Sequence, residues 1–85
     1  MFVIEDEAHG EPGSAFATKE EALAELQRLA ALPWDHPPNR APCTSWETCG
    51  RRYICTEYDD RCMPWRIISR VPVLDVSNNG VKWYS

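Results

Sequence analysis

Four cysteines are the most reactive side chains of this chain, and all of them stand in its second half: Cys43, Cys49, Cys55 and Cys62. Structural zinc sites usually have paired ligands two to four residues apart, whereas five, five and six residues separate these cysteines. A metal or redox site centred on Cys43 and Cys49 therefore requires the chain to double back between them. The alternatives are free thiols and a Cys43–Cys49 disulfide. We predict no cofactor, with zinc as the alternative.

Nucleophilic catalysis would need a thiolate next to a base. His36 follows Asp35 and lies in the same stretch as Cys43 and Cys49. The sequence therefore contains the residue types of an Asp-His-Cys set. No recognised nucleophile motif surrounds either cysteine, and no glycine-rich phosphate loop occurs. We assign no catalytic residue and favour a non-enzymatic protein, with a small enzyme that has a Cys/His site as an alternative.

The segment 33–50 is a long connection that we expect to be packed against the domain, because it holds two tryptophans and two cysteines. Long loops in compact domains are often functional, and Trp, Tyr and Arg dominate interface hot spots. We predict an interaction or regulatory domain that uses this 33–50 loop or a sheet edge to bind a protein partner or a second copy. The candidate binding residues are Trp34, His36, Trp46, Arg51 and Arg52.

One helix is predicted at about residues 18–32. Thr18 and Glu21 have the spacing of a capping box, in which each side chain bonds the backbone N–H of the other residue. Apolar residues then recur every three or four positions, and Pro33 ends the pattern.

Strands are predicted at residues 2–6, 51–58, 65–71, 73–77 and 81–84, and a short additional one at 15–17 is an alternative. Pro72 argues for an edge position or a bulge. Asn79-Gly80 predicts a type I′ hairpin with Val76 opposite Trp83. One buried face would then hold Leu74, Val76, Val81 and Trp83. The pattern of residues 51–58 does not decide which of their faces is buried.

This order of elements predicts a single domain over residues 1–85. Its class is α+β, a small two-layer domain with the helix packed on an antiparallel sheet of about four strands, in the order β-α-β-β-β(-β).

Charge is distributed unevenly along the chain. The net charge is −4, and residues 1–26 carry seven acids against one base. Such a balance disfavours nucleic acid as a partner, because phosphate binding needs a basic surface. No apolar run approaches the length of about 20 residues that a membrane helix needs, and the N-terminus lacks the features of a secretory signal. We expect a soluble, cytoplasmic protein that does not bind membranes.

Residues 33–53 contain the runs Pro-Trp-Asp-His-Pro-Pro-Asn-Arg-Ala-Pro-Cys and Trp-Glu-Thr-Cys-Gly-Arg-Arg-Tyr. This segment resembles a set of short uncharacterised bacterial proteins, which also share the strand–helix start and the tryptophan near the end. The resemblance covers most of the chain and implies a free-standing small bacterial protein. It implies no activity, since none is established for that set.

Overall fold

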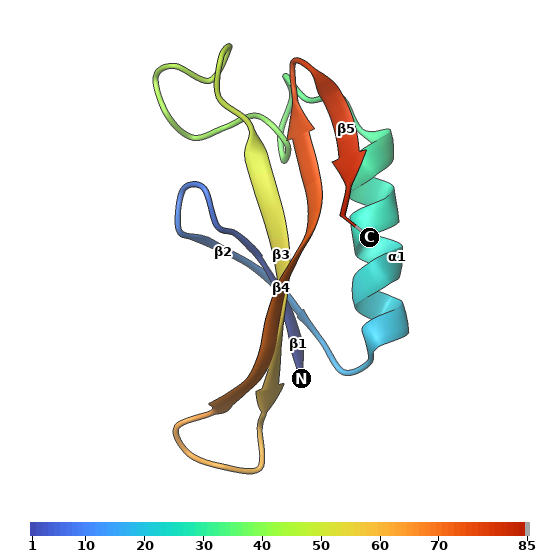
Figure 1. The fold of residues 1–85 in the computed structure, drawn as a ribbon, viewed down its shortest axis with the longest axis vertical. Coiled ribbons are helices and arrows are strands. Elements are labelled where there is room, and N and C mark those ends of the chain that lie inside the picture. The colour runs from blue at the N-terminus through green and yellow to red at the C-terminus, as the bar shows by residue number, and fades with distance from the viewer. Residues whose placement is uncertain (85) are drawn as a thin grey trace.

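The structure is a computed structural model that describes residues 1–84, and it has one helix on one face of a five-stranded antiparallel sheet (Figure 1). The strand order in the sheet is β2-β1-β3-β4-β5. The elements are β1 (Phe2–Asp6), β2 (Glu11–Phe16), α1 (Lys19–Ala31), β3 (Arg51–Asp59), β4 (Arg66–Ser77) and β5 (Gly80–Trp83). The predicted α+β class is therefore confirmed.

The strand β2 covers Glu11–Phe16, where the sequence predicts at most a short strand at 15–17. It pairs with β1 and lies at the edge of the sheet, so Pro12 needs no partner on its outer side. Gly13 sits at a bulge opposite Ile4, where a Cβ atom would lie 2.2 Å from the Ile4 carbonyl oxygen. The order is thus β-β-α-β-β-β, with one more strand before the helix than predicted.

The helix α1 begins as predicted. Thr18 is the N-cap, its hydroxyl accepts a hydrogen bond from the Glu21 amide, and the Glu21 carboxylate accepts one from the Thr18 amide. The buried face of α1 consists of Ala22, Leu26 and Leu29.

The hydrophobic core lies between this helix face and the sheet. Its sheet side is formed by buried side chains of three strands, namely Ile4, Tyr53, Leu74 and Val76. β3 runs through the centre of the sheet between β1 and β4. Tyr53, Ile54 and Thr56 are all buried, so the first part of β3 is covered on both of its faces.

The strands predicted at 65–71 and 73–77 form one strand, β4, which continues through Pro72. Tyr53 pairs with Leu74 and Ile54 pairs with Pro72, so Val73 is an extra residue in β4. The predicted bulge at this proline is therefore confirmed.

The hairpin of β4 and β5 is present in a different register from the predicted one. Val76 lies opposite Val81, not Trp83, and the turn has positive φ only at Gly80 (103°), so it is not type I′. The register differs by two residues, which keeps the predicted residues on one face. Val81 and Trp83 are nevertheless 45% and 46% exposed, because β5 is an edge strand and α1 contacts β1, β2 and β4. The prediction that both are buried is wrong.

Within residues 1–84, no helix has the length and apolar character required to cross a membrane.

Candidate metal centre

Two segments far apart in the sequence meet beside the end of β1. The β1–β2 turn contributes His9, and the 33–50 loop contributes Cys43 and Cys49. One imidazole nitrogen and the two Sγ atoms lie within 4.8 Å of one another, and His9 Nε2 is 3.4 Å from Cys49 Sγ. These three side chains, called the metal centre below, could hold a metal ion, since imidazole and thiolate are the usual ligands of zinc.

Asp6 sets the orientation of the imidazole. Its Oδ2 lies 2.7 Å from His9 Nδ1, and the carboxylate is only 2% exposed. This contact keeps a proton on Nδ1, so the Nε2 atom is the one available to a ligand. A carboxylate behind a histidine in this way is the common second partner of metal-binding imidazoles.

Asp6 is itself held from several sides. Its Oδ1 accepts hydrogen bonds from the backbone amides of Ala8 and Arg52, and its Oδ2 accepts one from the Arg51 guanidinium at 3.0 Å. Arg51 is 8% exposed and also binds the Glu11 carboxylate and the Arg40 carbonyl oxygen. It therefore joins β1, β2 and the 33–50 loop around the carboxylate that orients His9.

The 33–50 loop is anchored to the fold at Asn39, which is fully buried. Its amide nitrogen donates to the carbonyl oxygens of Leu29 and Leu32 at the end of α1, and its Oδ1 accepts a 2.8 Å hydrogen bond from the Tyr53 hydroxyl. Helix ends leave carbonyl groups without partners, so this side chain completes α1 while it fixes the loop.

The aromatic side chains of the loop form a second anchor. The rings of Trp34 and Trp46 are 5.9 Å apart between centroids, and the Arg40 guanidinium lies 4.1 Å from the centroid of the Trp46 ring. Trp34 packs against the core, and both tryptophans are partly exposed. The predicted packing of this loop is confirmed.

The two thiols differ in acidity because they share a hydrogen bond. The Cys49 thiol, the Ser45 hydroxyl and the His9 imidazole, in that order, lower the pKa of Cys43 to about 7. The Cys43 sulfur raises the pKa of Cys49, chiefly through the same hydrogen bond. Cys43 is thus the more acidic of the two thiols, and about half of it is deprotonated near pH 7.

The imidazole responds to this charge and to Asp6. The hydrogen bond to Asp6 is the main cause that raises the pKa of His9, and the Cys43 sulfur adds to the effect. The Nε2 atom lies 3.4 Å from Cys49 Sγ, whereas Cys43 is the sulfur that raises the pKa of His9. Metal binding would displace the protons that remain on the two thiols.

The structure brings Cys43 and Cys49 together, as the metal or redox alternative required, and all four cysteines are free thiols. The histidine beside them is His9, whereas the Asp-His-Cys set considered from the sequence used His36. His36 instead lies at the surface and pairs with Asp35. The spacing Asp6-x-x-His9 at the end of a strand was the one local signal that could have pointed to this histidine.

The remaining candidates lie apart from the two sulfurs. Cys55 is within β3 and packs against the core, and Cys62 lies in the β3–β4 turn. Arg51 is buried in its internal ion pairs, whereas Arg52 is exposed and pairs with Asp75.

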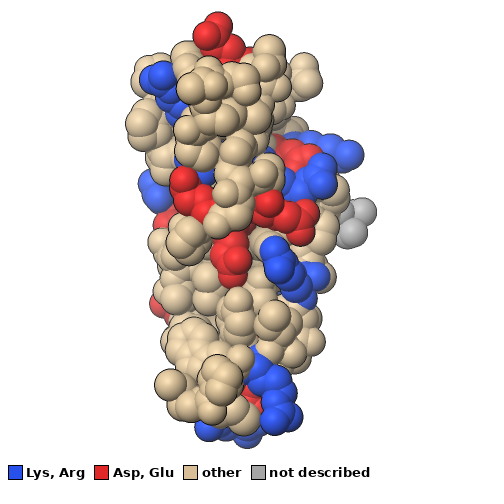
Figure 2. All heavy atoms as spheres, turned by 90° about the vertical axis from the view of Figure 1, so that its left-hand side faces the viewer, with Lys and Arg blue, Asp and Glu red and all other residues tan. Residues whose placement is uncertain are grey.

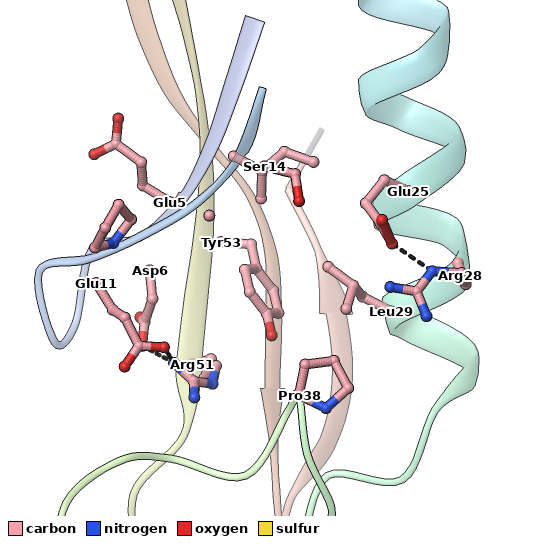
Figure 3. Close-up of a pocket in the computed structure, with 13 residues that line it drawn as sticks. Glu5, Asp6, Glu11, Ser14, Glu25, Arg28, Leu29, Pro38, Arg51 and Tyr53 are labelled. Carbon is pink, nitrogen blue, oxygen red and sulfur yellow. Dashed lines mark hydrogen bonds and ion pairs between the residues drawn. The ribbon is translucent and has the colours of Figure 1, made fainter. Parts of the chain in front are cut away.

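A cavity of about 170 Å³ lies between the sheet and the helix, and one of its lining residues is Asp6, which contacts His9 (Figure 3). Its walls include the Arg51–Glu11 ion pair at the sheet and the Glu25–Arg28 ion pair on α1. Figure 3 shows Asp6 and Arg51 at one end of it, and Asp6 also contacts His9 of the metal centre.

The surface around the β1–β2 hairpin is acidic. Figure 2 shows Asp and Glu side chains gathered at mid-height of the face that carries the hairpin turn on the left of Figure 1. The hairpin contributes Glu5, Glu7 and Glu11. Glu11 pairs with Arg51 and Glu7 lies 4.0 Å from Arg70, so arginine side chains offset part of this negative charge.

Two kinds of chemistry fit this arrangement. Asp6, His9 and Cys49 follow one another as the orienting acid, base and thiol of a nucleophilic site do. Such a site needs no second sulfur, however, and here Cys43 lies beside the first. Both thiols and one imidazole nitrogen converge here, and such a set could hold a metal ion.

No protein-family model, curated protein or solved structure matches this chain.

Proposed function

We propose that this protein is a small zinc-binding domain in which His9, Cys43 and Cys49 hold the ion. The observation that carries the proposal is the convergence of three ligand atoms within 4.8 Å, with a buried carboxylate behind the imidazole. Zinc bonds of about 2.0–2.3 Å at tetrahedral angles put ligand atoms roughly 3.5–3.8 Å apart. The His9 Nε2 to Cys49 Sγ distance of 3.4 Å is already near that range.

The ligand chemistry favours zinc over other divalent ions. Two thiolates and one imidazole are soft or borderline donors, whereas magnesium and calcium prefer oxygen ligands. Three ligands come from the chain, so a fourth position remains for water or for a group of a binding partner. The proposed role of the ion is to fasten the β1–β2 turn to the 33–50 loop and to fix the surface that Trp34, Arg40 and Trp46 form.

The test is elemental analysis of protein purified without chelator, together with the absorption spectrum of the cobalt-substituted protein. We expect one zinc per chain and the intense sulfur-to-cobalt charge-transfer bands of a thiolate site. His9→Gln, Cys43→Ser and Cys49→Ser should each lower the zinc content strongly. His36→Gln and Cys62→Ser are the matched controls and should leave it unchanged.

Zinc should also stabilise the fold, because an ion that binds only the folded chain shifts the unfolding equilibrium. At a free concentration 100 times its Kd, the gain is about 2.7 kcal/mol. A protein that contains no zinc and whose melting temperature is insensitive to both zinc and chelator would contradict the proposal.

A second candidate function is self-association or partner binding through the edge of β4. β5 pairs only with residues 74–77 of β4, so the outer side of residues 66–72 has no neighbouring strand among residues 1–84. Ile67 and Ile68 in this stretch are 55% and 57% exposed. Light scattering across a concentration series tests self-association, which Ile67→Lys should abolish; a monomer at all concentrations would contradict it.

A further inference from the structure

The two sulfurs of the metal centre are near enough to each other for a second reaction. They lie within 4.8 Å, whereas the bonded distance in a disulfide is about 2.05 Å. Residues 44–48 between them form a turn outside the helix and the strands, closed by hydrogen bonds from the amides of Thr48 and Cys49 to the Ser45 carbonyl oxygen. Four residues of this turn are exposed, and Trp46 alone is partly buried, against Trp34 and Arg40, so the turn can adjust without moving the core.

The other cysteines do not offer this reaction. Cys55 is held in the central strand β3, and Cys62 lies in the β3–β4 turn, outside the group that His9 forms with the two sulfurs. Cys43 and Cys49 are both partly exposed, so a small oxidant can reach them. Proximity therefore selects one pair of the four thiols.

We propose that Cys43 and Cys49 form a peroxide-sensitive switch, in which their oxidation to a disulfide releases the metal ion. The inference rests on the zinc site proposed above. The reactant that it assigns to the site is hydrogen peroxide or a small organic hydroperoxide. Oxidation is expected to remove the metal ion.

The reaction balances with peroxide as the two-electron oxidant. One thiolate sulfur attacks the peroxide, a sulfur–oxygen bond forms, the oxygen–oxygen bond breaks, and the leaving hydroxide takes up a proton to become water. The second sulfur then attacks the resulting sulfenic acid, the sulfur–sulfur bond forms, and a second hydroxide leaves as water. The two sulfurs supply two electrons, hydrogen peroxide becomes two waters, and zinc leaves as the divalent ion.

Release of the ion follows from the loss of its ligands. A disulfide sulfur is a poor ligand, because zinc binds the thiolate form, and His9 alone cannot retain the ion. The link between the β1–β2 turn and the 33–50 loop is then lost. A dithiol reductant restores both thiols, so the switch is reversible.

The test treats the zinc-loaded full chain with hydrogen peroxide. A chromogenic indicator follows the released zinc, and peptide mass spectrometry after thiol blocking locates the oxidised cysteines. We expect one zinc released for each Cys43–Cys49 disulfide, with full rebinding after dithiol treatment and added zinc. Cys62→Ser should behave identically. Metal-free Cys49→Ala, which lacks the second sulfur, should accumulate a sulfenic acid at Cys43 that a dimedone probe traps.

Several outcomes would overturn the inference, and they are separable from failure of the zinc site. If the protein retained zinc at peroxide concentrations that oxidise Cys62, the inference would be overturned. It would also be overturned if zinc were released while Cys43 became a sulfinic acid and Cys49 remained a free thiol. Both outcomes would leave the zinc proposal standing. If the chain formed the disulfide but never bound zinc, the zinc proposal would be contradicted. The proposed release of zinc on oxidation would then be contradicted as well.

Discussion

Asp6 and Arg51 face each other from the neighbouring strands β1 and β3, with 3.0 Å between Asp6 Oδ2 and Arg51 Nη1, and the same oxygen holds His9. A buried carboxylate thus serves the fold and the metal centre at once. Removing one partner of a buried ion pair leaves an uncompensated charge and destabilises the fold. An effect of an Asp6 variant on metal binding must therefore be distinguished from its effect on stability.

Asp6→Asn should lower zinc affinity about 10–100-fold, because the amide is a weaker partner for His9 than the carboxylate. Glu11→Gln is the matched control, since Glu11 binds Arg51 but does not touch His9. It should cost stability with little change in zinc affinity. Competition against a chelating indicator measures the affinity, and equal losses in the two variants would contradict an orienting role for Asp6.

Alkylation of metal-free protein should reveal the acidity of Cys43. Its pKa of about 7 predicts that its reaction with iodoacetamide accelerates as the pH rises through 7, because the thiolate is the reactive form. Cys49→Ala removes the largest cause of this shift and should move the midpoint upward, towards the ordinary value of 9.0. A midpoint that is the same in both proteins would contradict the shared hydrogen bond.

The same shift has a consequence for stability. The folded chain lowers the pKa of Cys43, so deprotonation favours the folded state. This contribution is fully present above the ordinary pKa of 9.0 and is lost as the pH falls through about 7. Chemical denaturation of metal-free protein at several pH values, compared with Cys43→Ser, measures it; parallel curves would contradict it.

Tyr53→Phe should destabilise the fold by about 1–3 kcal/mol, because the side-chain oxygen Oδ1 of Asn39 would remain buried without this donor. Tyr84→Phe is a control that removes a partly exposed hydroxyl, and it should cost less. Urea denaturation compares the two free energies of unfolding. An equal loss of unfolding free energy in both variants would contradict the prediction that the Asn39–Tyr53 hydrogen bond contributes more to stability than the hydrogen bond of Tyr84.

Gly13→Ala should destabilise the domain by about 1–3 kcal/mol, since its Cβ would collide with the backbone of Ile4. Gly10→Ala meets open space and bears only the strain of φ at +62°, which costs about 1 kcal/mol. Thermal unfolding compares them, and a smaller effect at Gly13 would contradict the close approach of β2 to β1.

The sequence predicted the elements that rest on local interactions. The capping box of α1 and the bulge at Pro72 depend on residues within a few positions or on the chemistry of one side chain. The strand β2 was missed because Pro12 and Gly13 are typical of turns, and only its place at the sheet edge makes them acceptable. The exposure of Val81 and Trp83 likewise depends on the position of β5 in the sheet, which the alternation of residues does not encode.

The grouping of His9, Cys43 and Cys49 was only partly predicted, for the same reason. Cys43 and Cys49 are close in the sequence and were paired, while His36 was preferred to His9 because it is nearer to them along the chain. His9 stands 40 residues before Cys49, and it reaches the sulfurs only because β1 pairs with β3. The sequence contained no direct signal of that pairing.

This separation bears on the order of events during synthesis. A ribosome-bound chain that ends before β3 holds His9 and both sulfurs but has no strand to bring them together, since β1 lies between β2 and β3. Closing the loop between His9 and Cys49 costs conformational entropy. Pairing of β1 with β3 offsets this cost. Ion capture would therefore be a late step, and metal uptake by nascent chains would report the moment when β3 joins β1.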